Sequence, residues 1–536
     1  MFTGRYASDR LFVWLCIAVL FVRLATAWPF EQPSYMDAYY YYNLAETLYR
    51  GEGFTDYVLW NFLDGPEGLP RPAGLYWMPL SSVLIWPFFE LLGPTFRAAQ
   101  IPFILLSTLL ALLAYRVAFD LSNDRRQALF VGLLIAFSGF YTVFWVTTDN
   151  FAPFAVFAGL AFYAAGRGIR EGRLLWFVAC GLSSGLAHLS RADGMLVAVA
   201  VLVSLPLAAW RGRLSRREAV IAAGVIVVCY LGTMFPWLYR NLRITGMPLA
   251  GGGIRTLFLR DYDELFAYSS LPSLDSYLSA GWTAILRSKA DALWLGVQNL
   301  LAVNLMVFLA PLALWGLWPW RRKVEIWPVA LYAVLLYFSM LLLFTFPGMR
   351  GGLFHSSAAL LPWLFAAAAH GLEAFVRSVA GHRRQWNPAT AYRFFAWGGI
   401  GLAVLLSAFL YWRAVSGGSP GSATPWNDRY RVYETVASRL KGQSGVEGDL
   451  VMVNNAPGFY YHAHRPAISI PNEGVDAVLD VARRYGVGYL VLEYDHPRPL
   501  DALYAGEETY GAVELVEELD DPSGVPVRIY RLRAGP

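Results

Sequence analysis

The stretch MDAYYYYNLA, residues 36–45, decides how this chain is interpreted. It holds one carboxylate, Asp37, beside four consecutive tyrosines, and it lies shortly after the first apolar run. Tyrosine rings favour the depth at which lipid headgroups meet water. A carboxylate at that depth can exchange protons with a bound molecule. The stretch therefore predicts a site at a membrane surface that handles an amphiphile.

The composition indicates a membrane protein. Of the 536 residues, 57% are hydrophobic, only 15% are charged and 20 are Trp, which excludes an ordinary soluble domain. The net charge of +4 does not indicate nucleic-acid binding, because many basic residues lie in short loops between apolar runs. Cys16, Cys180 and Cys229 all fall within apolar runs, so we expect buried thiols rather than disulfides.

Apolar runs long enough to cross a bilayer occur about eleven times, which predicts a polytopic α-helical membrane protein. We interpret the first run as a retained span, because it is long for the core of a signal peptide. The expected spans lie near residues 11–28, 97–120, 128–147, 150–166, 174–189, 194–209, 219–237, 293–317, 326–346, 357–376 and 394–413.

Basic residues predict the orientation of these spans. Clusters fall on one side of the membrane, which by the positive-inside rule is cytoplasmic. They are Arg5 and Arg10, Arg125–Arg126, Arg167–Arg173, Arg211–Arg217, Arg321–Lys323 and Arg377–Arg384. The N-terminus is therefore expected in the cytoplasm and the C-terminal segment outside. If residues 76–93 crossed the membrane, every later basic loop would lie outside. We therefore predict an interfacial helix there, with Trp77 and Trp86 as anchors.

These expectations divide the chain into two domains. A transmembrane module, residues 1–415, carries a first outer loop (29–96) and a long outer loop (238–292). A small exterior α/β domain, residues 416–536, follows a linker at 417–421. Its elements are predicted as a strand at 449–453, a helix at 475–485 and a strand at 487–493.

Two carboxylates at the outer surface are candidates for chemistry. Asp37 is interpreted as a catalytic base or a metal ligand, the alternative being a cap for a helix over 38–50. Asp149 lies at the outer end of the third expected span, and its alternative role is to cap the next one. Charges at this depth are costly and tend to serve function.

Other polar residues are expected near the same surface. Arg191 and Asp193 share a turn, where they either pair with each other or contact a ligand. Arg240 and Arg260, in the long outer loop, suit a phosphate headgroup, since arginine holds phosphate bidentately, although ordinary snorkelling is the alternative. We also expect substrate contacts from three further residues, although a lone histidine is more often a packed residue. They are Tyr40, Arg350 and His355.

The combination resembles the GT-C superfamily of integral membrane glycosyltransferases. The residues that carry the resemblance are an acidic residue early in a large first outer loop, an interfacial helix, and Pro236-Trp237 followed by Arg240-Asn241. The chain looks like the bacterial branch related to protein O-mannosyltransferases and lipid A aminoarabinose transferases. The stretch from Asp37 to Tyr42 also resembles the Asp-Pro-Tyr-Tyr motif of oligosaccharyltransferases. The resemblance covers residues 1–415.

The resemblance implies roles for three of these residues. Asp37 would be the essential acidic residue of the first loop, and Asp149 the second acidic position, which binds a divalent metal (Mg²⁺ or Mn²⁺) in some members. Arg240 would lie near the lipid phosphate. Two departures are Ala38, where mannosyltransferases have Glu, and the absence of the Trp-Trp-Asp-Tyr-Gly motif, which argues against asparagine glycosylation.

The implied reaction moves a sugar from a polyprenyl-phosphate donor to a hydroxyl acceptor, which is a protein, glycolipid or polysaccharide. It would take place at the outer face of a bacterial-type cytoplasmic membrane, by inverting displacement with Asp37 as base. The phosphate would lie against Arg240, helped by Arg191 or Arg260. A lipid-linked sugar transporter is the alternative, but it predicts ionisable residues at mid-membrane depth, whereas most candidates lie at one face. A non-catalytic scaffold would leave the aromatic carboxylate cluster unexplained.

Overall fold

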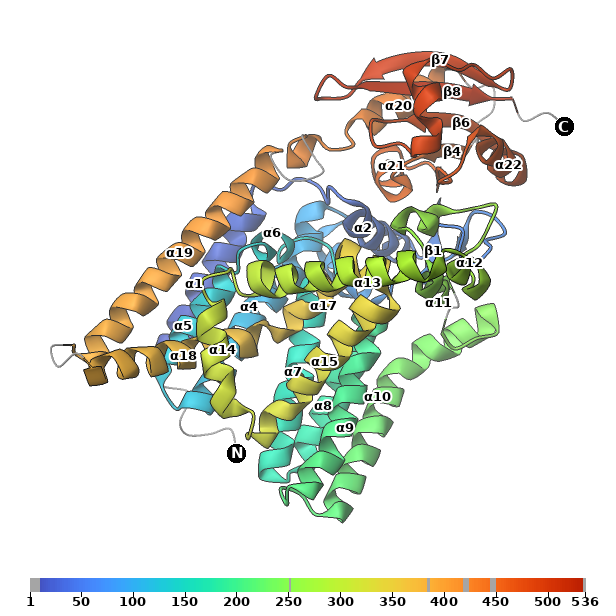
Figure 1. Cartoon of the computed structure of the whole chain (residues 1–536). Helices are drawn as coiled ribbons and strands as arrows, with labels where there is room; N and C mark the ends of the chain where they lie inside the picture. Colours follow the sequence, from blue (N-terminus) through green and yellow to red (C-terminus); the bar gives the residue numbers. More distant parts are fainter. Residues whose placement is uncertain (1–9, 250–251, 383–385, 418–423, 444–449, 534–536) are drawn as a thin grey trace.

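The computed structural model describes residues 10–249, 252–382, 386–417, 424–443 and 450–533. Figure 1 shows a bundle of helices with a small α/β domain at one end, as expected from the sequence. Among the described residues, eight helical segments are long and apolar enough to cross a membrane. The helices of the bundle include α1 (Arg10–Ala27), α4 (Phe96–Ser122), α7 (Phe151–Glu171), α8 (Leu174–Ser190), α9 (Met195–Trp210), α10 (Arg216–Thr245), α15 (Trp327–Phe338), α18 (Leu361–His382) and α19 (Pro388–Ser416).

The expected number of eleven spans is not confirmed, because two expected spans are broken and α8, at 17 residues, is shorter than the eight candidate spans. The run at 128–147 forms α5 (Arg125–Ala136) and the single turn α6 (Tyr141–Phe144), with Gly139 between them at a φ of 61°. The run at 293–317 begins inside α13 (Gly281–Gln298) and ends in α14 (Ala310–Trp320). The chain turns between them at Met306 and Val307, whose φ angles of 48° and 60° are not helical.

The first outer loop carries short elements. They are α2 (Met36–Tyr49), β1 (Thr55–Asp56), β2 (Val58–Leu59), β3 (Arg71–Pro72) and α3 (Leu80–Leu92). At about 1.5 Å per residue α3 is too short to cross a bilayer, which agrees with the interfacial helix expected there. Trp86 on α3 is 41% exposed, as an anchor requires. Trp77 instead stacks on Trp60, with ring centroids 4.0 Å apart.

The long outer loop begins later than predicted. Helix α10 continues through residue 238 to Thr245, where Gly246 ends it with a φ of 73°. The segment Pro236–Asn241 is therefore helical, and Arg240 projects from the last third of α10. The loop itself contains α11 (Gly252–Arg255), η2 (Thr256–Phe258), η3 (Tyr262–Phe266) and α12 (Leu274–Ser279).

The C-terminal domain is built on a sheet with strand order β2-β5-β4-β6-β8-β7. Its strands are β4 (Leu450–Val453), β5 (Ala467–Ser469), β6 (Val487–Leu492), β7 (Val513–Asp520) and β8 (Pro526–Leu532), with helices α20 (Val432–Gln443), α21 (Ala456–Ala463), α22 (Val475–Tyr485) and α23 (Asp501–Ala505). The predicted strand, helix and strand correspond to β4, α22 and β6. Residues 418–421 of the predicted linker and Asp449 lie outside the described residues, as do Arg5, Arg383 and Arg384 of the basic clusters.

The sheet also includes β2, which comes from the first outer loop. Val58 and Leu59 pair in parallel with Ala467 and Ile468 of β5. One hydrophobic core spans both parts, with Tyr41 and Trp60 from the loop packed with residues such as Tyr433 from the C-terminal domain. The first loop, including α2, is therefore folded together with the C-terminal domain.

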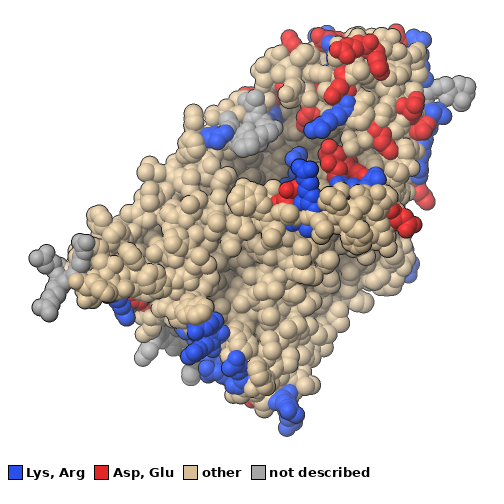
Figure 2. Space-filling view, in the orientation of Figure 1, with Lys and Arg blue, Asp and Glu red and all other residues tan. Residues whose placement is uncertain are grey.

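Charged side chains divide the molecular surface into zones. In Figure 2, Lys and Arg gather at the end of the bundle opposite the C-terminal domain, and a broad band with almost no charge lies between the two ends. The face is hollowed beneath the C-terminal domain, where charged side chains of both signs border the hollow. An uncharged band of this kind suits a bilayer.

Candidate active site

Asp37, Asp149 and His355 lie together although they are distant in the sequence. One potential ligand atom from each residue lies within 4.8 Å of the others. Asp37 comes from the first turn of α2, Asp149 from the segment before α7, and His355 from α17 (Leu353–Ser357). Asp149 is fully buried, and the other two side chains are half-buried.

Asp37 does not cap its helix. Helix α2 begins at Met36, and Tyr35 occupies the capping position without a side-chain hydrogen bond. The Asp37 side chain is therefore available for another role. The neighbouring backbone is fixed, because the Thr148 hydroxyl donates to the carbonyl of Ala38 at 2.8 Å.

Asp149 is held by three hydrogen bonds. Its Oδ1 accepts from the amide of Asn150 at 2.5 Å, and its Oδ2 accepts from the Tyr35 hydroxyl at 2.9 Å. The third contact joins Oδ2 to Nε2 of His355 at 3.1 Å. Asn150, not Asp149, occupies the capping position of α7. Such a set of donors fixes the carboxylate in one orientation.

The hydrogen bond made by Nδ1 of His355 places a proton on that nitrogen. Nδ1 lies 2.9 Å from the carbonyl oxygen of Gly351, which can only accept, so Nδ1 carries a proton. Nε2 then faces Oδ2 of Asp149 at 3.1 Å, a pairing from which both groups can bind one cation.

The two carboxylates titrate differently. Burial and the repulsion of Asp149 raise the pKa of Asp37 to about 7, against the opposing charges of His355 and Arg191. Burial alone would raise the pKa of Asp149, but His355 and the hydrogen bonds from His355, Asn150 and Tyr35 lower it below its ordinary value. Acid–base sites typically pair a carboxyl group of raised pKa, here Asp37, with a carboxylate of lowered pKa, here Asp149.

The cluster fits a divalent metal by its chemistry. Two carboxylates and an imidazole suit Mg²⁺ or Mn²⁺, Mn²⁺ accepting the nitrogen ligand more readily. The bond from His355 Nδ1 to a backbone carbonyl is the outer contact that metal-binding histidines commonly make. Sequence reasoning assigned Asp37 and Asp149 as metal ligands, and the structure places His355 with them.

Arg191 and Asp193 form the polar wall beside this cluster. Their side chains pair at 2.9 Å, and Arg191 also donates to Ser356 at 2.9 Å and to the Asn150 side chain at 3.2 Å. Ser356 in turn donates to Asp193. The turn is therefore satisfied internally, as one sequence interpretation held, and its contact with Asn150 joins it to the start of α7.

Two further tyrosines border the cluster. Burial is the main cause that raises the pKa values of Tyr76 and Tyr262. The nearby charge of Asp37 raises both values further. The Arg350 guanidinium stacks over the Tyr262 ring at 5.2 Å. Arg350 is thus connected to the site through Tyr262 of η3, which the sequence did not indicate.

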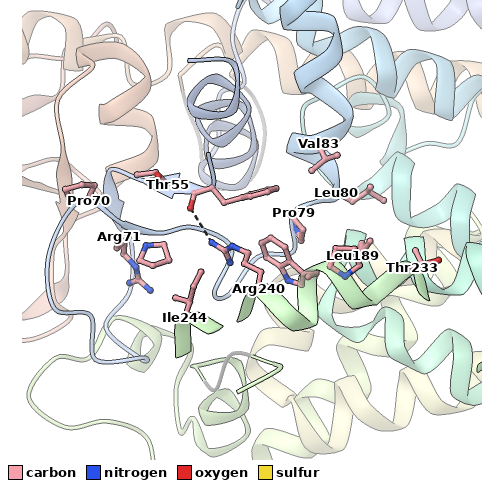
Figure 3. Close-up of a pocket in the computed structure, with 14 residues that line it drawn as sticks. Thr55, Pro70, Arg71, Pro79, Leu80, Val83, Leu189, Thr233, Arg240 and Ile244 are labelled. Atoms are coloured by element: carbon pink, nitrogen blue, oxygen red, sulfur yellow. Dashed lines mark hydrogen bonds between the residues drawn. The ribbon is translucent and has the colours of Figure 1, made fainter. Parts of the chain in front are cut away.

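An apolar groove opens near the cluster, with a volume of about 740 Å³. Figure 3 shows Arg71 toward one end of this groove, Leu80, Val83 and Leu189 toward the other, and Arg240 between them. Its lining comes from the first outer loop, α3, α8 and α10. A wall of this composition suits a hydrocarbon chain, and its two guanidinium groups suit an anion.

Arg240 is rigidly placed in this groove. Its Nη2 donates to the carbonyls of Ala73 at 2.8 Å and Phe54 at 3.3 Å, and it stacks over Trp237 at 4.5 Å. The amide of Gly74 then donates to the Tyr40 hydroxyl at 2.9 Å. Tyr40 follows Asp37 by one helical turn, so the cationic part of the groove connects directly to the carboxylate cluster.

The structure brings most of the predicted residues to these two places. Arg240 lines the groove, whereas Arg191 lies in the carboxylate cluster and Arg260 pairs with Glu264 at 2.5 Å, outside the groove lining. Tyr40 is buried and links the two places. Sequence reasoning missed Arg71, which pairs with Asp64 beside the groove. It lies on the two-residue strand β3, too short to be recognised from periodicity.

Comparison with known families finds one match. The family model described as dolichyl-phosphate-mannose-protein mannosyltransferase matches residues 72–237, which include the groove residues from Pro72 to Trp237. No curated protein sequence matches the chain significantly.

Two solved structures show the same fold. One is the archaeal oligosaccharyltransferase AglB from Archaeoglobus fulgidus, in complex with an inhibitory peptide and dolichol-phosphate (12% identity, TM-score 0.58, covering 98% of this chain and 74% of that one). The other is ArnT from Cupriavidus metallidurans bound to undecaprenyl phosphate (14% identity, TM-score 0.54, covering 99% of this chain and 100% of that one). At these identities the likeness establishes the fold.

Proposed function

We propose, from the membership of this chain in the GT-C superfamily of integral membrane glycosyltransferases, that it transfers a sugar from a polyprenyl-phosphate donor to a hydroxyl acceptor. The acceptor is a protein, glycolipid or polysaccharide. The reaction takes place at the outer face of a bacterial-type cytoplasmic membrane, with the N-terminus inside and the C-terminal domain outside.

The observation that carries this proposal is the apolar groove lined by two arginines. A polyprenyl chain lies along the apolar part, and its phosphate lies against Arg240 and Arg71. Both solved relatives were captured with a polyprenyl-type phosphate, which supports the same class of donor here. The hydrogen bonds through Ala73 and Gly74 to Tyr40 tie Arg240 to helix α2, which carries Asp37.

Asp37 acts as the general base. Its carboxylate takes the proton from the acceptor hydroxyl while the acceptor oxygen forms a bond to the anomeric carbon. The bond from that carbon to the phosphate oxygen breaks, the electron pair leaves on the lipid phosphate, and the anomeric configuration inverts. A base with a pKa of about 7 is well matched to neutral pH, and general base catalysis contributes about 10²–10⁴ in rate.

The rest of the cluster supplies positive charge and orientation. Arg240 and Arg71 neutralise the charge that develops on the leaving phosphate. Asp149 and His355, with Asp37, would hold a divalent metal, which when bound adds further charge neutralisation. Arg191 fixes the start of α7 through Asn150, and so holds Asp149 in place.

The experiment that tests the donor class measures transfer in detergent from polyprenyl-phosphate sugars and from nucleotide sugars carrying the same sugar. We expect transfer from the lipid-linked donors alone. Transfer from nucleotide sugars would contradict the proposal. Binding of lipid-linked donors with no transfer to any hydroxyl acceptor would instead favour a transporter of lipid-linked sugars.

A further inference from the structure

The first helix carries one charge on its buried side. Helix α1 buries only Leu15, Val19, Arg23 and Ala27, a stripe with one residue per turn. Arg23 is completely buried within this apolar span. Burying a guanidinium in a membrane helix costs desolvation free energy, which hydrogen-bond partners must offset.

Its partners are the last carbonyls of a broken helix. Arg23 donates through Nη1 to the carbonyl of Ala136 at 3.0 Å and through Nη2 to that of Ile135 at 2.8 Å. Helix α5 ends at Ala136, so these carbonyls have no partner within the helix. The planar fork of arginine satisfies both at once, at the negative end of the helix dipole.

The segment that follows the break leads to Asp149. The indole nitrogen of Trp145 donates to the Ser138 hydroxyl at 2.7 Å, and the Arg23 guanidinium lies 5.9 Å from the Trp145 ring centre. Gln100 donates to the carbonyl of Val146 at 3.2 Å. Thr148 then bonds to Ala38 beside Asp37. Each turn of the segment from the break to Asp149 is therefore fixed by a polar contact.

We propose that Arg23 is a positioning residue: by holding the end of α5 and the Trp145 ring, it sets the distance between Asp149 and Asp37. This inference rests on the proposed function, because that distance controls the general base. The break itself permits Asp149 to enter the cluster, since a continuous helix over 128–147 would carry the chain past it.

The test uses Arg23→Met and Trp145→Phe in the full-length protein, with Arg116→Met as control. Arg116 also lies in a helix of the bundle, where it donates to Tyr163 at 3.0 Å and pairs with Asp120 at 2.8 Å. It lies 16 residues beyond Gln100 on α4, roughly 24 Å along the helix axis.

We expect Arg23→Met to lower kcat by about 10²-fold, the typical cost of a misplacement near 1 Å, with the donor KM within about twofold. Trp145→Phe, which keeps an aromatic ring in the core, should also lower kcat, by about tenfold. Arg116→Met should leave both kcat and the donor KM unchanged.

Mn²⁺ affinity tests the inference even without a transfer assay, because the Asp37 and Asp149 carboxylates must lie close together to bind one ion. Arg23→Met and Trp145→Phe should weaken Mn²⁺ binding by more than about tenfold, whereas Arg116→Met should leave it unchanged. Wild-type Mn²⁺ affinity and wild-type kcat in both variants, even with a lower Tm, would overturn the inference. An inactive wild type whose Mn²⁺ affinity still depends on Arg23 would contradict the proposed function alone.

Discussion

Nε2 of His355 lies 3.1 Å from Oδ2 of Asp149, while the other nitrogen of the ring donates to the carbonyl of Gly351. Because that carbonyl fixes the proton on Nδ1, Nε2 and the Asp149 carboxylate can bind one cation together. Asp37 offers a third ligand atom within 4.8 Å of these two.

Asp37→Asn should lower sugar transfer by about 10²–10⁴-fold while leaving donor affinity unchanged, because the amide cannot accept the acceptor proton. Turnover and binding of a polyprenyl-phosphate sugar would be measured in parallel. Glu46→Gln is the matched control, since Glu46 is a buried carboxylate on the same helix that pairs with Arg50 at 2.7 Å, away from the cluster. Equal losses in both variants would indicate damage to α2 rather than loss of a base.

The stability of the metal-free protein should fall as the pH rises from about 5 to about 7. In the folded state Asp37 keeps its proton up to about pH 7, whereas in the unfolded chain its pKa returns to 3.8. The folded state thus binds more protons in this window, and its advantage disappears as the pH rises. Thermal unfolding at a series of pH values should give a shallower slope for Asp37→Asn. An identical slope would show that the Asp37 carboxyl titrates normally.

Mn²⁺ should bind the purified protein, and His355→Ala and Asp149→Asn should each weaken binding by more than about tenfold. Calorimetry or electron paramagnetic resonance would measure the affinity, and EDTA should lower sugar transfer. His462→Ala provides the control, because His462 pairs with Glu434 in the C-terminal domain at 3.1 Å. Undiminished Mn²⁺ binding in both cluster variants would exclude this site for the metal.

Arg71→Gln and Arg240→Gln should each raise the donor KM by roughly 10- to 100-fold. This is the loss of affinity expected when one hydrogen bond to a charged group is removed. The acceptor KM should stay the same, because neither side chain lies in the carboxylate cluster. Arg260→Gln should have little effect, since its guanidinium pairs with Glu264 outside the groove lining. A donor KM that responds to Arg260 and not to Arg71 would move the phosphate site to the long outer loop.

Much of the fold could be predicted from the sequence because membrane helices follow from composition. The polytopic bundle, the interfacial helix α3 and the strand–helix–strand order of the C-terminal domain were all accessible in this way. The breaks at Gly139 and at Met306 and Val307 were not, since the surrounding residues are as apolar as those of an intact span. Tertiary contacts such as those of Arg23 stabilise such a break, and they are invisible to a local pattern.

The candidate site was only partly predictable for a related reason. Asp37 and Asp149 were recognised because isolated carboxylates are rare at membrane depth. His355 was recognised as a residue near the surface, but its place beside Asp149 depends on how α17 packs on α7. No sequence pattern indicated Arg71, because it lies on the two-residue strand β3, whose partner β1 is equally short.

The pairing of β2 with β5 has a consequence for how the protein is made. The first outer loop leaves the ribosome early, but the strand that Val58 joins is synthesised almost at the other end of the chain. Val58 and Leu59 therefore have no partner strand until the helices of the bundle have been synthesised. Folding of the first outer loop is then completed late in biogenesis, and a chain interrupted before Ala467 should leave β2 unpaired.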